Sequence, residues 1–298
     1  MSDEVNLFAQ QEANVRRSRW LVIGFILFFA WLGFGGDFIW YLSTQHAPPE
    51  SYHHVFPWFG ILLTLIGAGM AKYSYSTGPK NILKSTGARE IIDPATPQEK
   101  QLVNVVEEMS VASGITKPHI WLIDDPDPNA FATGHDQSDS NIAVTQGLVA
   151  ICSRDELQGV IGHEMGHIKN LDVRLMTLLA ALVGVVALIA DGAGRVMWHG
   201  GFGGRRSRSS DDNKGTNPLV ILLFVIWIIS WILAPIITRM LAMGVSRKRE
   251  YLADAMSAQF TRNPMALASA LTKIESAAEP TRSIKGGAAH LCIADPLG

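Results

Sequence analysis

Long apolar stretches without charge alternate with polar segments along this chain. A transmembrane helix needs about 17–25 predominantly apolar residues, and four stretches approach or reach that length. They predict four transmembrane helices and a mainly α-helical membrane protein. The stretches cover residues 21–42, with one acid inside, and residues 56–71, 175–190 and 219–234.

Basic residues beside these stretches predict how the chain is oriented. Three arginines within residues 16–19 precede the first stretch, and Lys72 follows the second. Because cytoplasmic flanks carry an excess of Lys and Arg, we expect both flanks in the cytoplasm and the loop 45–54 outside. Basic residues at 239–249 place the C-terminal part in the cytoplasm too. The Arg-rich segment 195–217 contradicts the rule, since four crossings put it outside, but the other flanks outweigh it.

Composition narrows the class of protein further. Of the 298 residues, 48% are hydrophobic and only 17% are charged, and the apolar residues are clustered. The net charge of −2 gives no reason to expect a nucleic acid partner. Cys152 and Cys292 are too few for a disulfide framework, and neither belongs to a C-x-x-C motif. The lipid bilayer is the partner that composition itself predicts.

The motif H-E-x-x-H at residues 163–167 carries the clearest chemistry. Ser153, followed three residues later by Glu156, forms a capping-box pattern, and apolar residues then recur at helical spacing. His163 and His167 are therefore one turn apart on one face of a helix. Two imidazoles placed in this way can hold one Zn²⁺ ion.

Glu164 follows the first histidine and points about 100° away from it around the helix. Its carboxylate then lies beside the metal, where it can take a proton from an activated water and pass it to a leaving amine. A chance match is the weaker explanation, because the motif falls on a capped amphipathic helix. Gly159, Gly162 and Gly166 indicate that the metal, a substrate or another backbone must approach this helix closely.

A catalytic zinc takes three protein ligands and one water, so the motif lacks one ligand. Glu250 is the best candidate, because two crossings after His167 return the chain to the same side of the membrane. Asp254 lies one turn beyond Glu250 and can hold the N–H of a ligating histidine. Three other acids fit less well: Asp172 because it points off the ligand face, Asp155 because it lies in the first turn, and Glu275 because it lies on a later helix.

Short strands accompany the helices in the polar region between the second and third apolar stretches. Residues 119–123 predict one strand, and residues 129–133 and 141–145 predict a hairpin. A helix is expected to follow the capping box that begins at Thr96. Together these elements predict a cytoplasmic α+β, zincin-like metallopeptidase domain.

The predicted parts follow one another in a simple order. They are residues 1–19, a cytoplasmic N-terminal segment; 20–71, two transmembrane helices with a short external loop; 72–174, a cytoplasmic peptidase part with the zinc helix; 175–242, two transmembrane helices with a disordered external loop; and 243–298, a cytoplasmic peptidase part with the third ligand. For the first apolar stretch a cleaved signal peptide is the alternative. The long polar segment before it and the lack of an A-x-A site favour a retained anchor.

The chain resembles the HtpX-type membrane zinc metallopeptidases, relatives of the CAAX prenyl proteases, from about Gly78 to Gly298. The resemblance rests on residues 129–134, 144–148, 163–167, 249–254 and 289–291. It implies a gluzincin fold, one zinc ion per chain, and an integral protein of the bacterial inner membrane with a cytoplasmic active site. The implied substrates are misfolded or damaged membrane proteins and unfolded polypeptides. It leaves open homo-oligomers or other quality-control proteases as partners.

The resemblance also implies an edge strand beside the cleft. We therefore expect a substrate to pair with that strand, since main-chain hydrogen bonds do not demand one sequence. The residues of this expected substrate site are Asn129, Ala130, Phe131, Ala132 and Thr133.

Two other functions were weighed against a peptidase. Zinc transporters and intramembrane proteases carry the motif inside an apolar run, whereas charged residues flank it here. A purely structural zinc site usually takes four protein ligands and needs no base such as Glu164. The sequence therefore favours a membrane-bound zinc endopeptidase.

Overall fold

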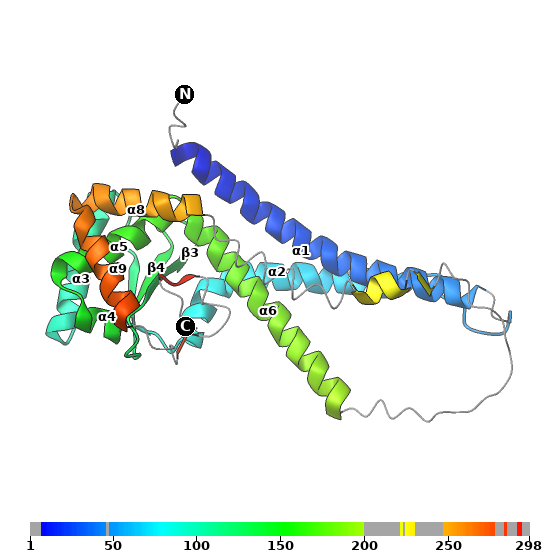
Figure 1. Cartoon of the computed structure of the whole chain (residues 1–298). Coiled ribbons are helices and arrows are strands. Elements are labelled where there is room, and N and C mark those ends of the chain that lie inside the picture. Colours follow the sequence, from blue (N-terminus) through cyan, green and yellow to red (C-terminus); the bar gives the residue numbers. More distant parts are fainter. Residues whose placement is uncertain are drawn as a thin grey trace. The chain divides into compact units, whose positions relative to one another are not determined.

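A computed structural model describes most of the chain, and its helices and strands are drawn in Figure 1. The described residues are 7–45, 48–199, 221–222, 224–229, 247–277, 283–284 and 291–293, with side chains left out at 187–199 and 247–248. The helices are α1 (Leu7–Thr44), α2 (Trp58–Ser85), α3 (Pro97–Ser113), α4 (Gln146–Ile151), α5 (Arg154–Lys169), α6 (Asp172–His199), α8 (Arg247–Thr261) and α9 (Pro264–Ala277). The strands are β1 (Arg89–Glu90), β2 (His119–Ile123), β3 (Ala130–Gly134) and β4 (Ser140–Thr145).

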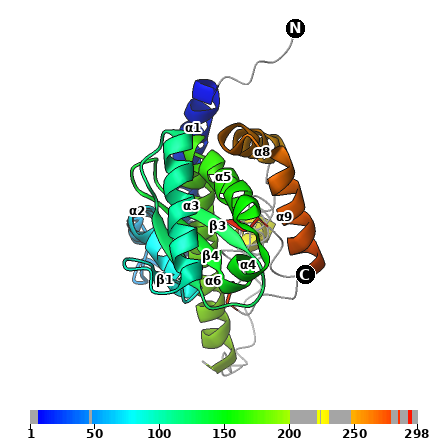
Figure 2. The ribbon, with the colours of Figure 1, turned by 90° about the vertical axis from the view of Figure 1, so that its left-hand side faces the viewer.

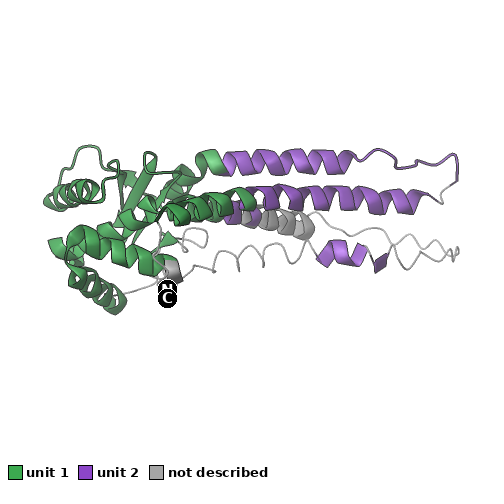
Figure 3. Ribbon diagram, turned by 90° about the horizontal axis from the view of Figure 1, so that it is seen from above, with its two compact units in different colours: residues 1–20, 75–181, 242–298 green, residues 21–74, 182–241 purple. Residues whose placement is uncertain are grey.

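The chain divides into two compact units, coloured in Figure 3. Unit 1 contains residues 1–20, 75–181 and 242–298, and unit 2 contains residues 21–74 and 182–241. Unit 1 holds the sheet and the motif H-E-x-x-H, and it is mainly helical with a small sheet.

The sheet of unit 1 has the strand order β1-β2-β4-β3. β4 pairs in parallel with β2 and antiparallel with β3, with Ala132 opposite Ile142. The expected strand at 119–123 and the expected hairpin are confirmed, each within one residue. Among the described residues β4 is the only strand that pairs with β3, so β3 lies at the edge of the sheet. The two-residue β1 was not expected, since it is too short to show an alternating pattern.

The two faces of the sheet carry different cores, as the period-two alternation of strands requires. One face packs with α3 and α5, which lie side by side (Figure 2). Ala130 and Ala132 of β3 belong to this face. The opposite face packs with Leu83 of α2 and Ala180 of α6, and Phe131 points to it. The side chains of β3 therefore pack into two cores, and the edge of β3 that does not pair with β4 presents only backbone groups.

The helix α5 begins where its cap predicts and lies close to two later helices. Ser153 and Glu156 form the expected capping box. A Cβ added at Gly159 would lie 2.7 Å from the backbone nitrogen of Leu267 in α9, and one at Gly166 would lie 3.1 Å from the Cα of Ala253 in α8. The glycines thus allow the backbones of α8 and α9 to approach, which is one of the three reasons that the sequence suggested.

One described helix, α1, is long and apolar enough to cross a membrane by length and composition. The third predicted crossing falls within α6, and all but the first two residues of the second fall within α2, while half of the fourth, at 219–234, lies outside the described residues. The four-helix arrangement therefore stays a prediction. The described helices also extend beyond the apolar stretches. Residues 7–19 form the first turns of α1, although their polar composition indicated only a cytoplasmic segment.

A buried polar cluster joins α1 and α2 in unit 2. Asp37 is 4% exposed and His54 is 2% exposed, and their side chains meet at 2.8 Å. The backbone N–H of Gly60, in the first turn of α2, donates to the other oxygen of Asp37 at 2.6 Å. The indole ring of Trp40 stacks on the imidazole of His54 with centroids 4.6 Å apart. Asp37 therefore caps α2 and binds the loop before it.

Replacing Asp37 by Ala should destabilise this hairpin. The change leaves the N–H groups of α2 and the imidazole of His54 without their buried acceptor. Such losses cost about 3 kcal/mol in the free energy of unfolding. Denaturant unfolding of the purified chain in detergent measures the loss, with Glu50→Ala, at an exposed loop residue, as control. Equal stability of the two variants would show that the cluster does not hold the hairpin.

Candidate metal centre

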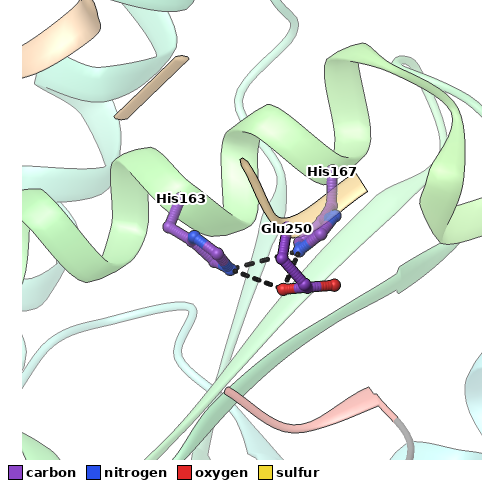
Figure 4. A group of neighbouring side chains, drawn as sticks. All are labelled: His163, His167 and Glu250. Carbon is purple, nitrogen blue, oxygen red and sulfur yellow. Dashed lines mark hydrogen bonds and ion pairs between the residues drawn. The ribbon is translucent and has the colours of Figure 1, made fainter. Parts of the chain in front are cut away.

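The helix α5 presents His163 and His167 on one face toward a single point. His163 is 4% exposed, and its Nε2 lies 3.2 Å from the Nε2 of His167. α8 brings the carboxylate of Glu250 to the same point. Its Oε2 lies 3.6 Å from the Nε2 of His163 and 3.7 Å from the Nε2 of His167. Figure 4 shows the three side chains converging from the two helices.

These distances suit a tetrahedral ion. Zinc ligands at about 2.0–2.2 Å from the metal lie roughly 3.3 Å from one another at tetrahedral angles. The three distances between ligand atoms here bracket that value. Within the described residues this is the only group of three acids, histidines or cysteines close enough together to hold a metal. The donor set of two imidazoles and one carboxylate is typical of a catalytic zinc site with one position left for water.

The second ring nitrogen of each histidine has its own carboxylate. The Nδ1 of His163 lies 2.9 Å from Asp254 of α8, the residue that the sequence suggested for this role. The Nδ1 of His167 lies 3.3 Å from Asp172. In each case the hydrogen bond at Nδ1 leaves Nε2 as the nitrogen that faces Glu250, and it fixes the plane of the ring.

Asp172 is not in the group that could hold a metal, as the sequence analysis expected, but its contact with Nδ1 of His167 was not expected. The sequence analysis assumed that the helix of His167 continued through residue 172. α5 ends at Lys169, and Leu171 has a φ of 58°, so the chain turns before α6 begins. The turn carries Asp172 back toward the ring of His167. In the sequence, the only sign that α5 ends here is that the apolar periodicity stops at Lys169-Asn170. Of the other acids considered, neither Asp155 nor Glu275 belongs to the group that could hold a metal.

Carboxylates around the two imidazoles favour positive charge at this point. Burial lowers the pKa of His163, but hydrogen bonds with Asp254 and Glu250 outweigh it and the pKa is raised. Burial also lowers the pKa of His167, yet its contacts with Asp172 and Glu250 raise it to about 10. Burial raises the pKa of Glu250, and its bonds to both imidazoles more than offset this and lower it. Surroundings that favour a proton on each imidazole also favour a divalent cation between them.

Glu164 lies beside this group and touches the edge strand. Its side chain is 2% exposed, and it accepts a hydrogen bond from the backbone N–H of Ala132. Burial raises the pKa of Glu164 above its ordinary value, although the two imidazoles lower it in part. A carboxylate whose pKa is raised toward the operating pH is a stronger base, and both its charged and its protonated form are then accessible near neutral pH.

The five residues of the expected substrate site divide into two rows. Asn129 faces β4, since its carbonyl accepts from the N–H of Thr145 at 3.0 Å, and the backbone groups of Phe131 and Thr133 point the same way. The backbone groups of Ala130 and Ala132 point the other way. The N–H of Ala132 reaches Glu164, and the carbonyl of Ala130 accepts from Ile293 at 3.0 Å. The outward row is therefore partly used by the chain itself.

The side chains of these five residues are all buried. Phe131 is 0% exposed and belongs to the core between the sheet, α2 and α6. Its side chain therefore packs in the interior and does not line a cleft. Whatever β3 offers to a ligand comes from its backbone.

A helix with H-E-x-x-H, a carboxylate from a later helix and an edge strand beside them define a metallopeptidase. Comparison with known sequences agrees with the site. Residues 96–289 match peptidase family M48. The chain belongs to this family, among its HtpX-type metallopeptidases, which confirms the resemblance seen in the sequence.

Three curated relatives, each named protease HtpX homolog, illustrate the similarity. The relative from Caldanaerobacter subterraneus subsp. tengcongensis is 38% identical over 294 residues, which cover 98% of this chain and 90% of the relative. The relative from Streptococcus gordonii is 34% identical over 97% of this chain and 91% of its own length. The relative from Dictyoglomus turgidum is 42% identical over 76% of this chain and 69% of its own length.

Replacing Glu250 by Ala should weaken metal retention. It removes one of three ligand atoms and the negative charge that faces both imidazoles. We expect zinc content after dialysis to fall well below one ion per chain, measured by elemental analysis. Glu275→Ala, an exposed acid on α9, is the matched control. Full zinc content in both variants would remove Glu250 from the metal centre.

Proposed function

We propose that this metallopeptidase is a membrane-bound, zinc-dependent endopeptidase that hydrolyses misfolded or damaged membrane proteins. The observation that carries the proposal is the convergence of His163, His167 and Glu250 beside the buried base Glu164. A structural metal site has no use for such a base. An endopeptidase needs it next to the metal and next to a strand that can hold the peptide.

In the proposed reaction, three residues of the site bind the metal and a fourth transfers the proton. His163, His167 and Glu250 would hold a zinc ion, which would supply the Lewis acidity that makes a water molecule acidic enough to react near pH 7. Glu164 takes the proton of that water as it attacks the peptide carbonyl. Glu164 then gives the proton to the leaving amine nitrogen, and the C–N bond breaks. Its raised pKa suits both steps, because the group must gain and lose one proton in each cycle.

The substrate lies as an extended strand along β3 in this proposal. β3 is an edge strand whose side chains are buried, so recognition through its backbone demands no particular peptide sequence. The hydrogen bond from Ile293 to Ala130 supports this role, because it is a bond that an added strand would make. A substrate either pairs from Ala132 onward or displaces Ile293.

Membrane attachment rests on the helices and on the flanking charges. α1 is long and apolar enough to cross a bilayer, and apolar stretches at 56–71, 175–190 and 219–234 add the further crossings of the proposed four-helix arrangement. The excess of Lys and Arg beside α1 and α2 supports a metal centre on the cytoplasmic side of a bacterial inner membrane. Damaged inner-membrane proteins and unfolded chains are then the substrates within reach.

Replacing Glu164 by Gln should abolish proteolysis and keep the metal. The amide has nearly the same shape but cannot accept the proton, so turnover should fall by about 10²–10⁴-fold. Degradation of a membrane test protein by the purified chain measures the loss, with a chelator control for metal dependence. Asp155→Asn, an exposed acid in the first turn of α5, should keep its activity. Near-normal turnover of the Glu164 variant would assign the base to another group.

If a peptide binds along β3, every second backbone N–H group of the peptide should contribute to its affinity. In a peptide that pairs with the outward row, alternate N–H groups face β3 and the others face away. N-methylation of one facing position removes a hydrogen bond of about 1–1.5 kcal/mol, so binding should weaken roughly tenfold. Methylation of the adjacent positions is the matched control and should change binding little. Competition against a fluorescent substrate measures both, and a uniform response along the peptide would exclude the strand model.

A further inference from the structure

One polar side chain of α1 is fully buried against the end of α5. Asn14 is 0% exposed, while Arg16 and Arg17 on the next turn are open to solvent. Its Nδ2 donates to the backbone carbonyl of Asn170 at 3.1 Å and to Oδ1 of Asp172 at 2.7 Å. Burying an amide is unfavourable unless it forms such bonds, so this side chain occupies a defined position.

Asp172 links Asn14 to the metal centre. It is 2% exposed, and its second oxygen accepts from Nδ2 of Asn170 at 2.9 Å and lies 3.3 Å from Nδ1 of His167. The carboxylate is therefore held from both sides, by two asparagines and by the imidazole. Its orientation decides which nitrogen of His167 faces His163 and Glu250.

The turn that carries Asp172 needs support of its own. Leu171 has a φ of 58°, a left-handed conformation that is unfavourable for a residue with a side chain. Asn14 binds the carbonyl of the residue just before this turn and the carboxylate just after it. It therefore bridges the turn between α5 and α6.

The geometry points to Asn14 as a positioning residue for the metal ligand His167, acting through Asp172. On this assignment the first turns of α1, which lie before its apolar stretch, help to set the geometry of the metal centre. The inference rests on the proposed function, because it requires that His167 binds the metal. No sequence pattern indicated it, since Asn14 and Asp172 are 158 positions apart.

A purely structural role for Asn14 is the alternative, and Gln11 allows the two to be separated. Gln11 lies on the same part of α1, and its Nε2 donates to the carbonyl of Lys169 at 2.6 Å. It attaches α1 to the end of α5 without touching Asp172. A variant of Gln11 therefore reports what loss of attachment does by itself.

The experiment compares zinc affinity and the spectrum of the cobalt-loaded protein across variants of the full chain in detergent. We expect Asn14→Ala to weaken zinc binding about 10–100-fold, as loss of an outer partner of a ligand does, and to shift the d–d bands of Co²⁺. kcat should fall with little change in KM. Gln11→Ala should keep the affinity and the spectrum of the parent chain. If Asn14→Ala does not fold, Asn14→Leu keeps the side-chain volume and removes the same two bonds.

A double-mutant cycle with Asp172→Ala tests whether Asn14 acts on His167 through Asp172. If Asn14 acts through Asp172, Asn14→Ala should change zinc affinity little once Asp172 is absent. Additive losses, an unchanged affinity in Asn14→Ala, or an equal loss in Gln11→Ala would each overturn the assignment. His167→Ala is measured in parallel. If that variant keeps its zinc, the proposed metal site itself is wrong, which separates that failure from failure of the role of Asn14.

Discussion

The close approach of α8 to the glycine face of α5 is the contact on which the metal centre depends. Gly162 and Gly166 bring the backbones together, since a Cβ at either position would press on Ser257 or Ala253 at 3.1–3.4 Å. Only at that separation does Glu250 reach the point between His163 and His167. The glycines weaken α5 as an isolated helix by about 0.5–1 kcal/mol each. Burial of α5 among α3, α8, α9 and β3 offsets this cost.

The sequence predicted best what depends on neighbours along the chain. The two capping boxes, the strand at 119–123 and the hairpin follow from local patterns, and the structure has them. The spacing of His163 and His167 places both on one face for the same reason. Glu250 was identified because a zinc site lacks a ligand without it, and Asp254 because it lies one turn beyond Glu250. The structure brings both to the histidines.

What the sequence did not predict depends on one turn and on contacts between distant residues. Asp172 was set aside because helical geometry was extended through Leu171, whose left-handed backbone ends that geometry. Asn14 gave no signal, because an asparagine in a polar segment is usually exposed. Its burial appears only when α1 is placed beside the end of α5. The number of crossings stays a prediction for a related reason, since apolar length shows that a helix can cross and does not show that it does.

The two histidines are held by carboxylates in unlike surroundings. Asp172, beside His167, has a side chain only 2% exposed, whereas the side chain of Asp254, beside His163, is 45% exposed. Asp254 also lies on α8, the helix that supplies Glu250. A small displacement of α8 would therefore loosen one ligand and the support of a second, while His167 stays fixed by α5, α6 and α1. The geometry around His163 therefore depends on how α8 packs against α5, whereas the ring of His167 is oriented by a carboxylate that α1 also holds.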